Sequence, residues 1–415
     1  MTVFAALTPP YLGHLNPFLA LAETLRARGD RVVFVLQEDG AQRVRERGHE
    51  AVAVGAASHP PGMLAQMERR LAGTGGPWTV PATVRDMVDL TNMLCREVPA
   101  AVQVLGAEVI LADQLEPAGG LVARRLGLAF GSVANALPIN EEPDVPPPYI
   151  GWGYKPDEKG RRRNGWGRYL SGWLMRPLEV EIARWSAQWG LGPLRTLEDC
   201  LSPAVQVAQC VEPLDFPRAR LPPGFTYAGP FRGGYEVWED PEPGDRRPLV
   251  YASLGTLQGS RARLLGAIAQ ACAALDVRLV LAHGGGLSPE EALSLPGRPI
   301  VMAYAPQRAI LARAQAIVCH AGFNTVLDAL ACGVSMVLAP LGFEQPGTAA
   351  RVARTGAGLV LGRNRRAGAI AQALSRVLVE PSFRANAARL AAAIATSGGV
   401  ECAADKIQSL TPRKR

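Results

Sequence analysis

Short apolar runs alternate with longer amphipathic segments through the first third of the chain. The runs are almost continuously apolar, as expected for strands buried on both faces of a parallel sheet. Strands are predicted at Val3–Leu7, Arg31–Leu36, Ala51–Val54, Val109–Ala112 and Ala129–Val133. Between them, apolar residues at helical spacing predict helices at about Leu15–Arg28, Ala41–Arg47, Thr83–Leu105 and Pro117–Leu126. This alternation is typical of a doubly wound α/β domain.

The second half repeats the alternation after a change in composition. Residues 236–248 (EVWEDPEPGDRRP) are acidic, Pro-rich and without periodicity, which indicates a linker. Further strands are predicted at Leu249–Leu254, Val277–Ala282, Ile300–Tyr304, Ala316–Cys319, Ser335–Ala339 and Leu359–Leu361. The Ala-rich stretch Ala369–Ser409 is predicted to be helical. We therefore expect two α/β domains, 1–235 and 249–397, with a terminal segment at 398–415.

An aromatic segment separates the two series of strands. Residues 138–168 contain several prolines and predict an irregular loop. Beyond it, a set of large apolar residues approximates one face of a helix, with Pro177 as a kink. The set is Trp166, Leu170, Trp173, Leu178, Ile182, Trp185 and Trp189. Either these residues pack a core, or they form a wall of an apolar acceptor pocket that touches a membrane, because basic residues flank the aromatic ones.

Composition narrows the class of protein. The 415 residues, 48% hydrophobic and 20% charged, suit two globular domains. The net charge of +7 is spread along the chain, so no nucleic-acid partner is expected. The seven cysteines lack C-x-x-C spacing and predict reduced thiols rather than zinc ligands or disulfides. With neither a targeting signal nor a membrane-spanning run, the expectation is a cytoplasmic protein that at most rests on a membrane surface.

The stretch 300–345 carries the densest polar chemistry. Ligands of parallel α/β sheets bind beyond the carboxyl ends of the strands, and here those ends are followed by Tyr304, Gln307, residues 320–325, Glu344 and Gln345. The turn 319–325 combines His320 and Gly322 with a helix start, so its free N–H groups can hold a diphosphate. A second glycine turn, Ser253-Leu-Gly255-Thr256, follows the first strand of this domain.

The same stretch predicts how a nucleotide would be held. Asp328 lies one helical turn beyond Asn324 and can accept hydrogen bonds from ribose hydroxyls, which favours a ribonucleotide. Tyr304 offers a face for a base. No two aspartates are two positions apart in the chain, so the D-x-D metal clamp of many sugar transferases is missing. A helix dipole, His320 and hydroxyl groups would then stabilise a leaving diphosphate without metal.

A candidate general base lies in the first domain. His14 follows the first strand in a turn shaped by proline and glycine, and Asp113 ends the fourth strand of the same predicted sheet. A carboxylate on the far imidazole nitrogen would fix the tautomer and stabilise the imidazolium. The alternative is that each residue merely caps a helix. His49 and His59 read as loop residues, and His283 has no assigned role.

These residues resemble the donor signature of the family 1 UDP-dependent glycosyltransferases. The resemblance is carried by Tyr304-Ala305-Pro306-Gln307, by residues 320–325 (HAGFNT), by Asp328 and by Glu344-Gln345. Gly13-His14 resembles the base turn of that family. Four longer stretches resemble its carotenoid-modifying branch: 116–119 (EPAG), 136–140 (ALPIN) with Glu142-Pro143, 214–218 (LDFPR) and 252–259 (ASLGTLQG).

The resemblance implies a GT-B fold, in which two Rossmann-like domains face each other across a cleft, and a C-terminal helix that crosses back to the first domain. It implies inversion at the anomeric carbon, no metal and no cofactor beyond the co-substrate UDP-glucose. The resemblance also implies a role for each donor residue. Tyr304 would stack on uracil, Ala305 and Gln307 would lie beside the nucleoside, and Asp328 would bind the ribose. The diphosphate would be held by His320, Gly322, Asn324 and Thr325, with Ser253, Gly255 and Thr256 nearby, and the sugar would be bound by Glu344 and Gln345. His14 would be the base, supported by Asp113.

The sequence departs from the plant members of the family at three positions. Tyr304 and Phe323 stand where Trp is common, and Asp328 replaces Glu. These changes conserve stacking and ribose binding. We therefore expect glucose transfer to the hydroxyls of a carotenoid. Transfer to a polyketide or other lipophilic aglycone, nucleotide-sugar epimerisation, and an inactive partner subunit are the competing hypotheses.

Overall fold

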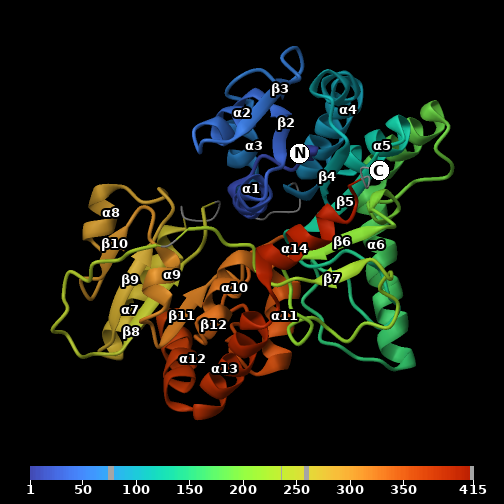
Figure 1. Ribbon diagram of the computed structural model, residues 1–415. Coiled ribbons are helices and arrows are strands. Elements are labelled where there is room, and N and C mark those ends of the chain that lie inside the picture. The colour runs from blue at the N-terminus through green and yellow to red at the C-terminus, as the bar shows by residue number, and fades with distance from the viewer. Residues whose placement is uncertain (73–78, 235, 257–260, 412–415) are drawn as a thin grey trace.

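The computed structural model describes residues 1–72, 79–234, 236–256 and 261–411, which form two lobes built on separate parallel sheets (Figure 1). The first sheet has the strand order β3-β2-β1-β4-β5-β6-β7. Its strands are β1 (Val3–Leu7), β2 (Arg31–Gln37), β3 (Glu50–Val54), β4 (Val109–Asp113), β5 (Ala129–Ala134), β6 (Val205–Ala208) and β7 (Phe225–Tyr227). The predicted strands are all present. The short β6 and β7 were not predicted, because neither shows a long apolar run.

Helices cover both faces of this sheet. They are α1 (Leu12–Ala27), α2 (Glu38–Arg45), α3 (Met63–Ala72), α4 (Thr79–Leu105) and α5 (Pro117–Leu126). Alternate residues of β1 divide between two cores: Phe4 and Ala6 pack with α1 and α2, whereas Ala5 and Leu7 pack with α4 and α5. Both faces are thus buried, which explains the continuous apolar runs.

The second sheet has the strand order β10-β9-β8-β11-β12-β13. Its strands are β8 (Leu249–Ser253), β9 (Arg278–Ala282), β10 (Ile300–Met302), β11 (Ala316–Cys319), β12 (Ser335–Leu338) and β13 (Gly358–Val360). Its helices are α7 (Ala262–Ala274), α8 (Pro289–Leu293), α9 (Gln307–Leu311), α10 (Phe323–Ala331), α11 (Gln345–Thr355), α12 (Ala367–Val379) and α13 (Pro381–Ala395). One face packs with α7 and α12, and the other with α9, α10 and α11.

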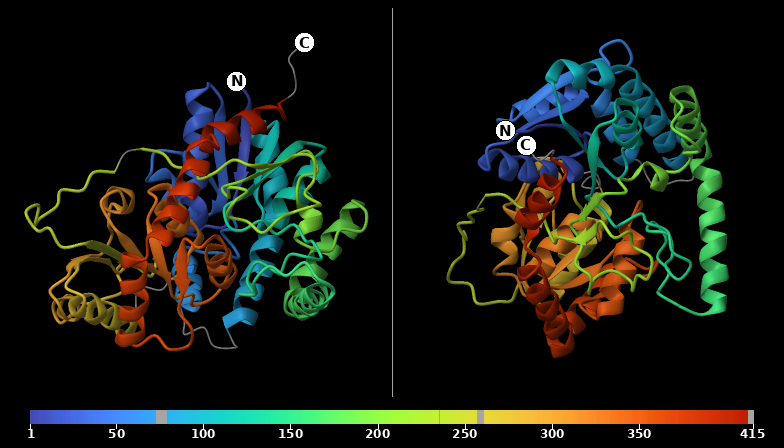
Figure 2. Two further views of the ribbon diagram at one scale, coloured as in Figure 1. Left: turned by 90° about the horizontal axis from the view of Figure 1, so that it is seen from below. Right: turned by 45° about the vertical axis from the view of Figure 1, so that its right-hand side comes forward.

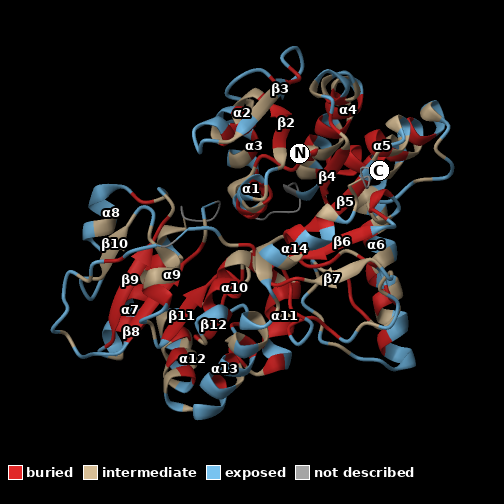
Figure 3. Ribbon diagram, in the orientation of Figure 1, coloured by how far each residue is buried: buried red, intermediate tan, exposed pale blue. Residues whose placement is uncertain are grey.

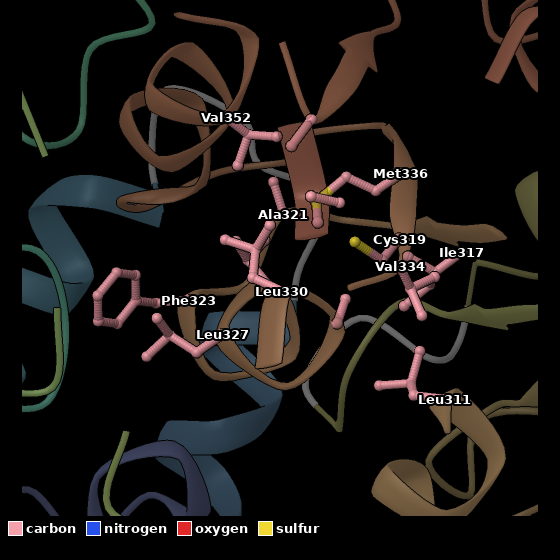
Figure 4. Packing of buried hydrophobic residues seen from close by; sticks show 14 of the residues in the cluster. Leu311, Ile317, Cys319, Ala321, Phe323, Leu327, Leu330, Val334, Met336 and Val352 are labelled. Atoms are coloured by element: carbon pink, nitrogen blue, oxygen red, sulfur yellow. The ribbon is translucent and has the colours of Figure 1, made fainter. Parts of the chain in front are cut away.

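The two lobes share one hydrophobic core. Cys210 and Leu214, which follow β6, belong to the same buried cluster as Phe323 and Leu327 of α10. Figure 4 shows Phe323 and Leu327 on one side of α10 and Leu330 directed toward the second sheet. The two lobes therefore pack directly against each other beside α10.

The chain returns to the first lobe at its end. Helix α14 (Gly399–Gln408) packs against α1 and β6, and Ala403 and Ile407 join the core of the first sheet (Figures 1 and 2). Arg28 makes ion pairs with Glu401 and Asp405 of α14.

Helix α6 (Glu158–Trp189) begins ten residues earlier than the predicted end of the loop, so the loop prediction for 158–168 was wrong. Asp157 starts the helix by accepting a hydrogen bond from Gly160 N at 2.7 Å. The predicted single apolar face was also wrong: Leu178, Ile182 and Trp185 are buried, but Trp166, Leu170 and Trp173 are exposed. The other face of this half is covered by the preceding loop, because Asn164 and Gly167 are buried beside Pro143 and Trp152. The aromatic face stays exposed (Figure 3). No helix of the described residues is long and apolar enough to cross a membrane.

Candidate active site

Two equivalent points of the two sheets face one cavity. In the first sheet, β1 lies beside β4, with Leu7 opposite Ala112; in the second, β8 lies beside β11, with Ser253 opposite Cys319. The strand order reverses at both places, which is where open α/β sheets bind ligands. A cavity of about 1540 Å³ spans the two. It exceeds the usual volume of a small-molecule pocket, so it has room for two substrates.

All predicted donor residues line this cavity: Ser253, Gly255, Thr256, Tyr304, Ala305, Gln307, His320, Gly322, Asn324, Thr325, Asp328, Glu344 and Gln345. His14 lines it from the opposite lobe, and Asp113 lies behind His14, fully buried. The structure thus brings together residues more than 300 positions apart in sequence. The last part of the stretch 252–259, residues 257–259, lies outside the described residues.

His14 and Asp113 are in direct contact. The distance from His14 Nδ1 to Asp113 Oδ2 is 2.7 Å, so Nε2 is left for the cavity. The helix α1 begins at Leu12, which places His14 in its first turn rather than in the preceding loop. Asp113 is held by Leu115 N on Oδ1 at 2.8 Å and by Asn135 Nδ2 on Oδ2 at 2.8 Å. Asn135, which directly follows β5, therefore supports the His14–Asp113 pair. The sequence did not predict this role.

The surroundings of His14 favour its protonated form. Burial of the imidazole lowers its pKa, but the charge and hydrogen bond of Asp113, with a smaller contribution from Glu344, outweigh burial, so that the pKa of His14 is raised. Burial raises the pKa of Glu344. Backbone hydrogen bonds and the charge of His14 oppose this shift but do not cancel it. A histidine that gains basicity from a buried carboxylate is suited to accept a proton.

The turn after β11 brings an imidazole against a helix start. Gly322 precedes the first residue of α10, and a Cβ there would lie 2.2 Å from His320 Nε2; at Gly255 it would lie 2.8 Å from the same atom. Only glycine therefore fits at both positions. Ala321 adopts a left-handed backbone, with φ of 65°, a strained conformation of the kind found at functional turns.

His320 is a neutral hydrogen-bonding group. Burial lowers its pKa to about 4, although a hydrogen bond with the Ser253 backbone opposes the shift. Its Nδ1 is buried and has no protein partner within the described part of the chain. The free N–H groups of α10 add positive potential beside it. The turn can therefore hold an anion by hydrogen bonds and a helix dipole.

Asp328 is already engaged on both oxygens. Arg232 Nε contacts Oδ1 at 2.5 Å, and Gln307 Nε2 donates to Oδ2 at 2.7 Å. Arg232 also donates to Gln209 Oε1 at 2.7 Å and to the Asn324 carbonyl at 3.3 Å. It enters from the segment between the two sheets and was missed, because no local pattern marks it. Each carboxylate oxygen can still accept a further hydrogen bond.

The remaining predicted donor residues differ in exposure, since Gln345 and Ser253 are buried and Tyr304 is not. Tyr304 is 68% exposed, with its ring open to the cavity. Gln345 Oε1 accepts hydrogen bonds from Leu341 N at 2.8 Å and Gly342 N at 3.1 Å, which fixes the loop before α11. Ser253 Oγ accepts from Gly255 N at 3.2 Å, so it shapes its own turn.

The other histidines have ordinary surroundings. His283 is buried and accepts from Leu287 N at 3.0 Å through Nδ1, which is a structural role. His49 and His59 lie in loops, as predicted, and His59 is buried there. His49 packs edge-on against Phe34. In the part of the chain that the structure describes, no three His, Cys, Asp or Glu side chains are arranged to hold a metal ion.

The stretch 214–218 has a structural function. Asp215, completely buried, contacts Arg351 of α11 at 2.6 Å and Arg218 at 2.9 Å and accepts from Tyr227 Oη at 3.0 Å. This network links the first lobe to the second through Arg351. Its residues explain the motif without any role in chemistry.

A large apolar lobe of the cavity opens on the His14 side. Its walls come from α3, α4 and α6: Met67, Leu71, Val84, Met87, Leu90, Leu174, Met175, Leu178 and Ile182. Glu116 lines this lobe with a buried carboxyl whose Oε1 has no partner among the described residues. Burial and the nearby Asp113 charge raise the pKa of Glu116 to about 8.

Residues 196–395 match the family described as UDP-glucoronosyl and UDP-glucosyl transferase, and the chain belongs to this family of glycosyltransferases. It is 37% identical to a zeaxanthin glucosyltransferase of Pantoea ananas, covering 99% of this chain and 96% of the relative, and 36% identical to that of Pseudescherichia vulneris, covering 98% of each. Its structure is similar to the calicheamicin glycosyltransferase, with a TM-score of 0.76 at 22% identity over 99% and 98% of the two chains. The resemblance and the GT-B fold predicted from the sequence are confirmed.

Proposed function

We propose that the protein transfers glucose from UDP-glucose to the hydroxyl groups of zeaxanthin or a similar carotenoid, with inversion at the anomeric carbon. The observation that carries this proposal is one cavity that joins a His–Asp pair, an anion-binding turn and a long apolar lobe. Full-length similarity to two zeaxanthin glucosyltransferases supports the choice of acceptor. The protein would work in the cytoplasm, in peripheral contact with the inner face of the membrane.

The chemical step would be an in-line displacement. The acceptor hydroxyl loses its proton to His14 Nε2 while its oxygen forms a bond to the anomeric carbon. The bond between that carbon and the diphosphate oxygen breaks, and UDP leaves with the electron pair. Asp113 stabilises the imidazolium that forms, and attack from the side opposite to UDP inverts the configuration.

The departing diphosphate would be stabilised by the turn at His320 to Thr325. The N–H groups of α10 and the neutral His320 donate hydrogen bonds where negative charge develops. No metal or further cofactor enters this scheme. Tyr304 would stack on uracil, Asp328 would accept from the ribose, and Glu344 and Gln345 would contact the sugar.

The test combines purified protein with UDP-glucose and a panel of zeaxanthin, other carotenoids and polyketide aglycones. We expect UDP release and a glucoside with zeaxanthin, with or without a chelator. Products with an aglycone alone would overturn the carotenoid assignment, and a new nucleotide sugar without acceptor would indicate epimerisation. His320→Ala should weaken UDP binding in calorimetry; unchanged affinity would remove His320 from the donor site.

A second acceptor class is favoured by one feature of the cavity. The apolar part of the cavity, called the acceptor lobe because it would hold the acceptor, is lined by unbranched and branched aliphatic side chains. These side chains fix no particular shape. A polyketide or other lipophilic aglycone with one hydroxyl near His14 could occupy the same space. The panel above separates the two acceptors directly.

A further inference from the structure

One face of α6 exposes large aromatic side chains. Trp166, Tyr169, Leu170 and Trp173 are 67%, 72%, 59% and 69% exposed. Their spacing of three and four residues places them along one stripe of the helix. Single exposed apolar residues are ordinary, but two tryptophans, a tyrosine and a leucine in consecutive turns form a contiguous patch, which marks an interaction surface.

Basic residues lie at both ends of this stripe. Arg162 precedes Trp166 by one turn, and Arg176 follows Trp173 by nearly one turn; both are exposed and neither makes an ion pair within the described ranges. The acidic residues of α6 lie elsewhere or are engaged: Glu158 is at the start, Glu179 is partly buried, and Glu181 pairs with Arg184. The stripe is therefore positive, with an apolar centre.

The opposite side of the same helix lines the acceptor lobe. Leu174, Met175 and Leu178 face the cavity, whereas Trp166 and Trp173 do not contribute to it. Figure 2 shows α6 as a long helix at the outer edge of the molecule, with its N-terminal half projecting away from the first sheet. One helix thus separates the acceptor cavity from an exposed aromatic surface.

We propose that residues 162–176 of α6 dock on an anionic lipid surface and bring the acceptor lobe against the bilayer. Trp and Tyr side chains favour the interface between lipid and water, and arginines extend toward anionic headgroups. Each basic residue near such a surface strengthens binding about fivefold. The inference rests on the proposed function, because a lipophilic acceptor dissolves in the bilayer.

Charge favours a membrane over a second copy of this chain as the occupant. In an antiparallel pairing of two α6 helices, Arg162 of one copy would lie near Arg176 of the other. A parallel pairing would oppose identical arginines. Either arrangement sets like charges against each other, whereas an anionic headgroup layer neutralises both ends at once.

The test measures co-sedimentation of the full chain with vesicles of phosphatidylcholine, with and without one-third phosphatidylglycerol. We expect binding to the anionic vesicles. Trp166→Ser with Trp173→Ser should reduce it at least tenfold. Arg162→Gln with Arg176→Gln should reduce it about thirtyfold at low salt, and high salt should remove this difference from the wild type. Matched controls are Val104→Ser with Leu293→Ser and Arg263→Gln with Arg384→Gln, which are exposed residues outside residues 162–176.

Binding equal to that of the wild type in both α6 variants would overturn the proposal. So would a dimer in solution, measured by sedimentation, that the Trp variant abolishes. Turnover adds a second comparison: the α6 variants should keep their rate on acceptor dissolved in detergent and lose it on acceptor embedded in vesicles. Vesicle binding without any glucoside would contradict the proposed function while leaving the docking surface intact.

Discussion

Asn324 Nδ2 donates a hydrogen bond to the carbonyl of Gly13 at 2.8 Å, although the two residues are 311 positions apart. Gly13 immediately precedes His14, and Asn324 lies in the first turn of α10 beside the proposed anion-binding turn. A single side chain therefore links the predicted diphosphate site of one lobe to the candidate base of the other.

Asn324→Ala should lower turnover more than it lowers stability. The variant loses the bond to Gly13 and two longer bonds that Asn324 Oδ1 accepts from Gln209 and Arg232. Each hydrogen bond contributes about 1 kcal/mol or less to stability, but the variant also releases the turn that carries His14. We expect kcat/KM to fall at least tenfold with a small change in Tm. The matched control is Asn386→Ala, which removes a bond to the Gly356 carbonyl at 3.3 Å within the second lobe. Equal losses of activity in the two variants would contradict this linking role.

The pH dependence of turnover should report on His14. A general base works when neutral, and because the pKa of His14 is raised above 6.5, the acidic limb of kcat/KM should lie above that value. Asp113→Asn removes the charge but keeps the burial, so the limb should move to lower pH while the maximal rate falls. His14→Ala should cost roughly 10²- to 10⁴-fold in turnover with UDP binding retained. An unmoved limb in Asp113→Asn would exclude His14 as the group that titrates.

Asp328→Asn should reduce discrimination between ribose and deoxyribose. The substitution keeps the shape of the side chain but loses the contact with Arg232 and an acceptor for ribose hydroxyls. We expect UDP affinity to fall about tenfold and affinity for the 2′-deoxy nucleotide to change less. Calorimetry with both ligands measures this, with exposed Asp276→Asn as the control. A parallel loss for both nucleotides would assign Asp328 to the interface with Arg232 instead of the ribose.

The sequence predicted most of the fold because buried parallel strands leave a local signal. The strand at 316–319, for example, was located to the residue. Site residues at strand ends, such as His320, could be inferred because topology fixes where such ends meet. Asn135 and Arg232 could not, since their roles depend on contacts across 22 and 96 positions that no local pattern encodes. The start of α6 was missed because glycines and prolines around it weakened the helical pattern.

Glu116→Gln should stabilise the protein at alkaline pH and have little effect in acid. The pKa of the unfolded carboxyl lies near its ordinary value of 4.5, whereas in the folded protein the pKa is raised to about 8. The folded state therefore binds the extra proton, and wild-type stability falls as pH rises from about 5 to 8 and then levels. Glutamine mimics the neutral acid and does not titrate. The Tm difference between variant and wild type should grow across that window, and exposed Glu239→Gln should show no such growth. A difference that is constant with pH would mean that Glu116 is ionised in the folded protein and that its Oε1 has a partner.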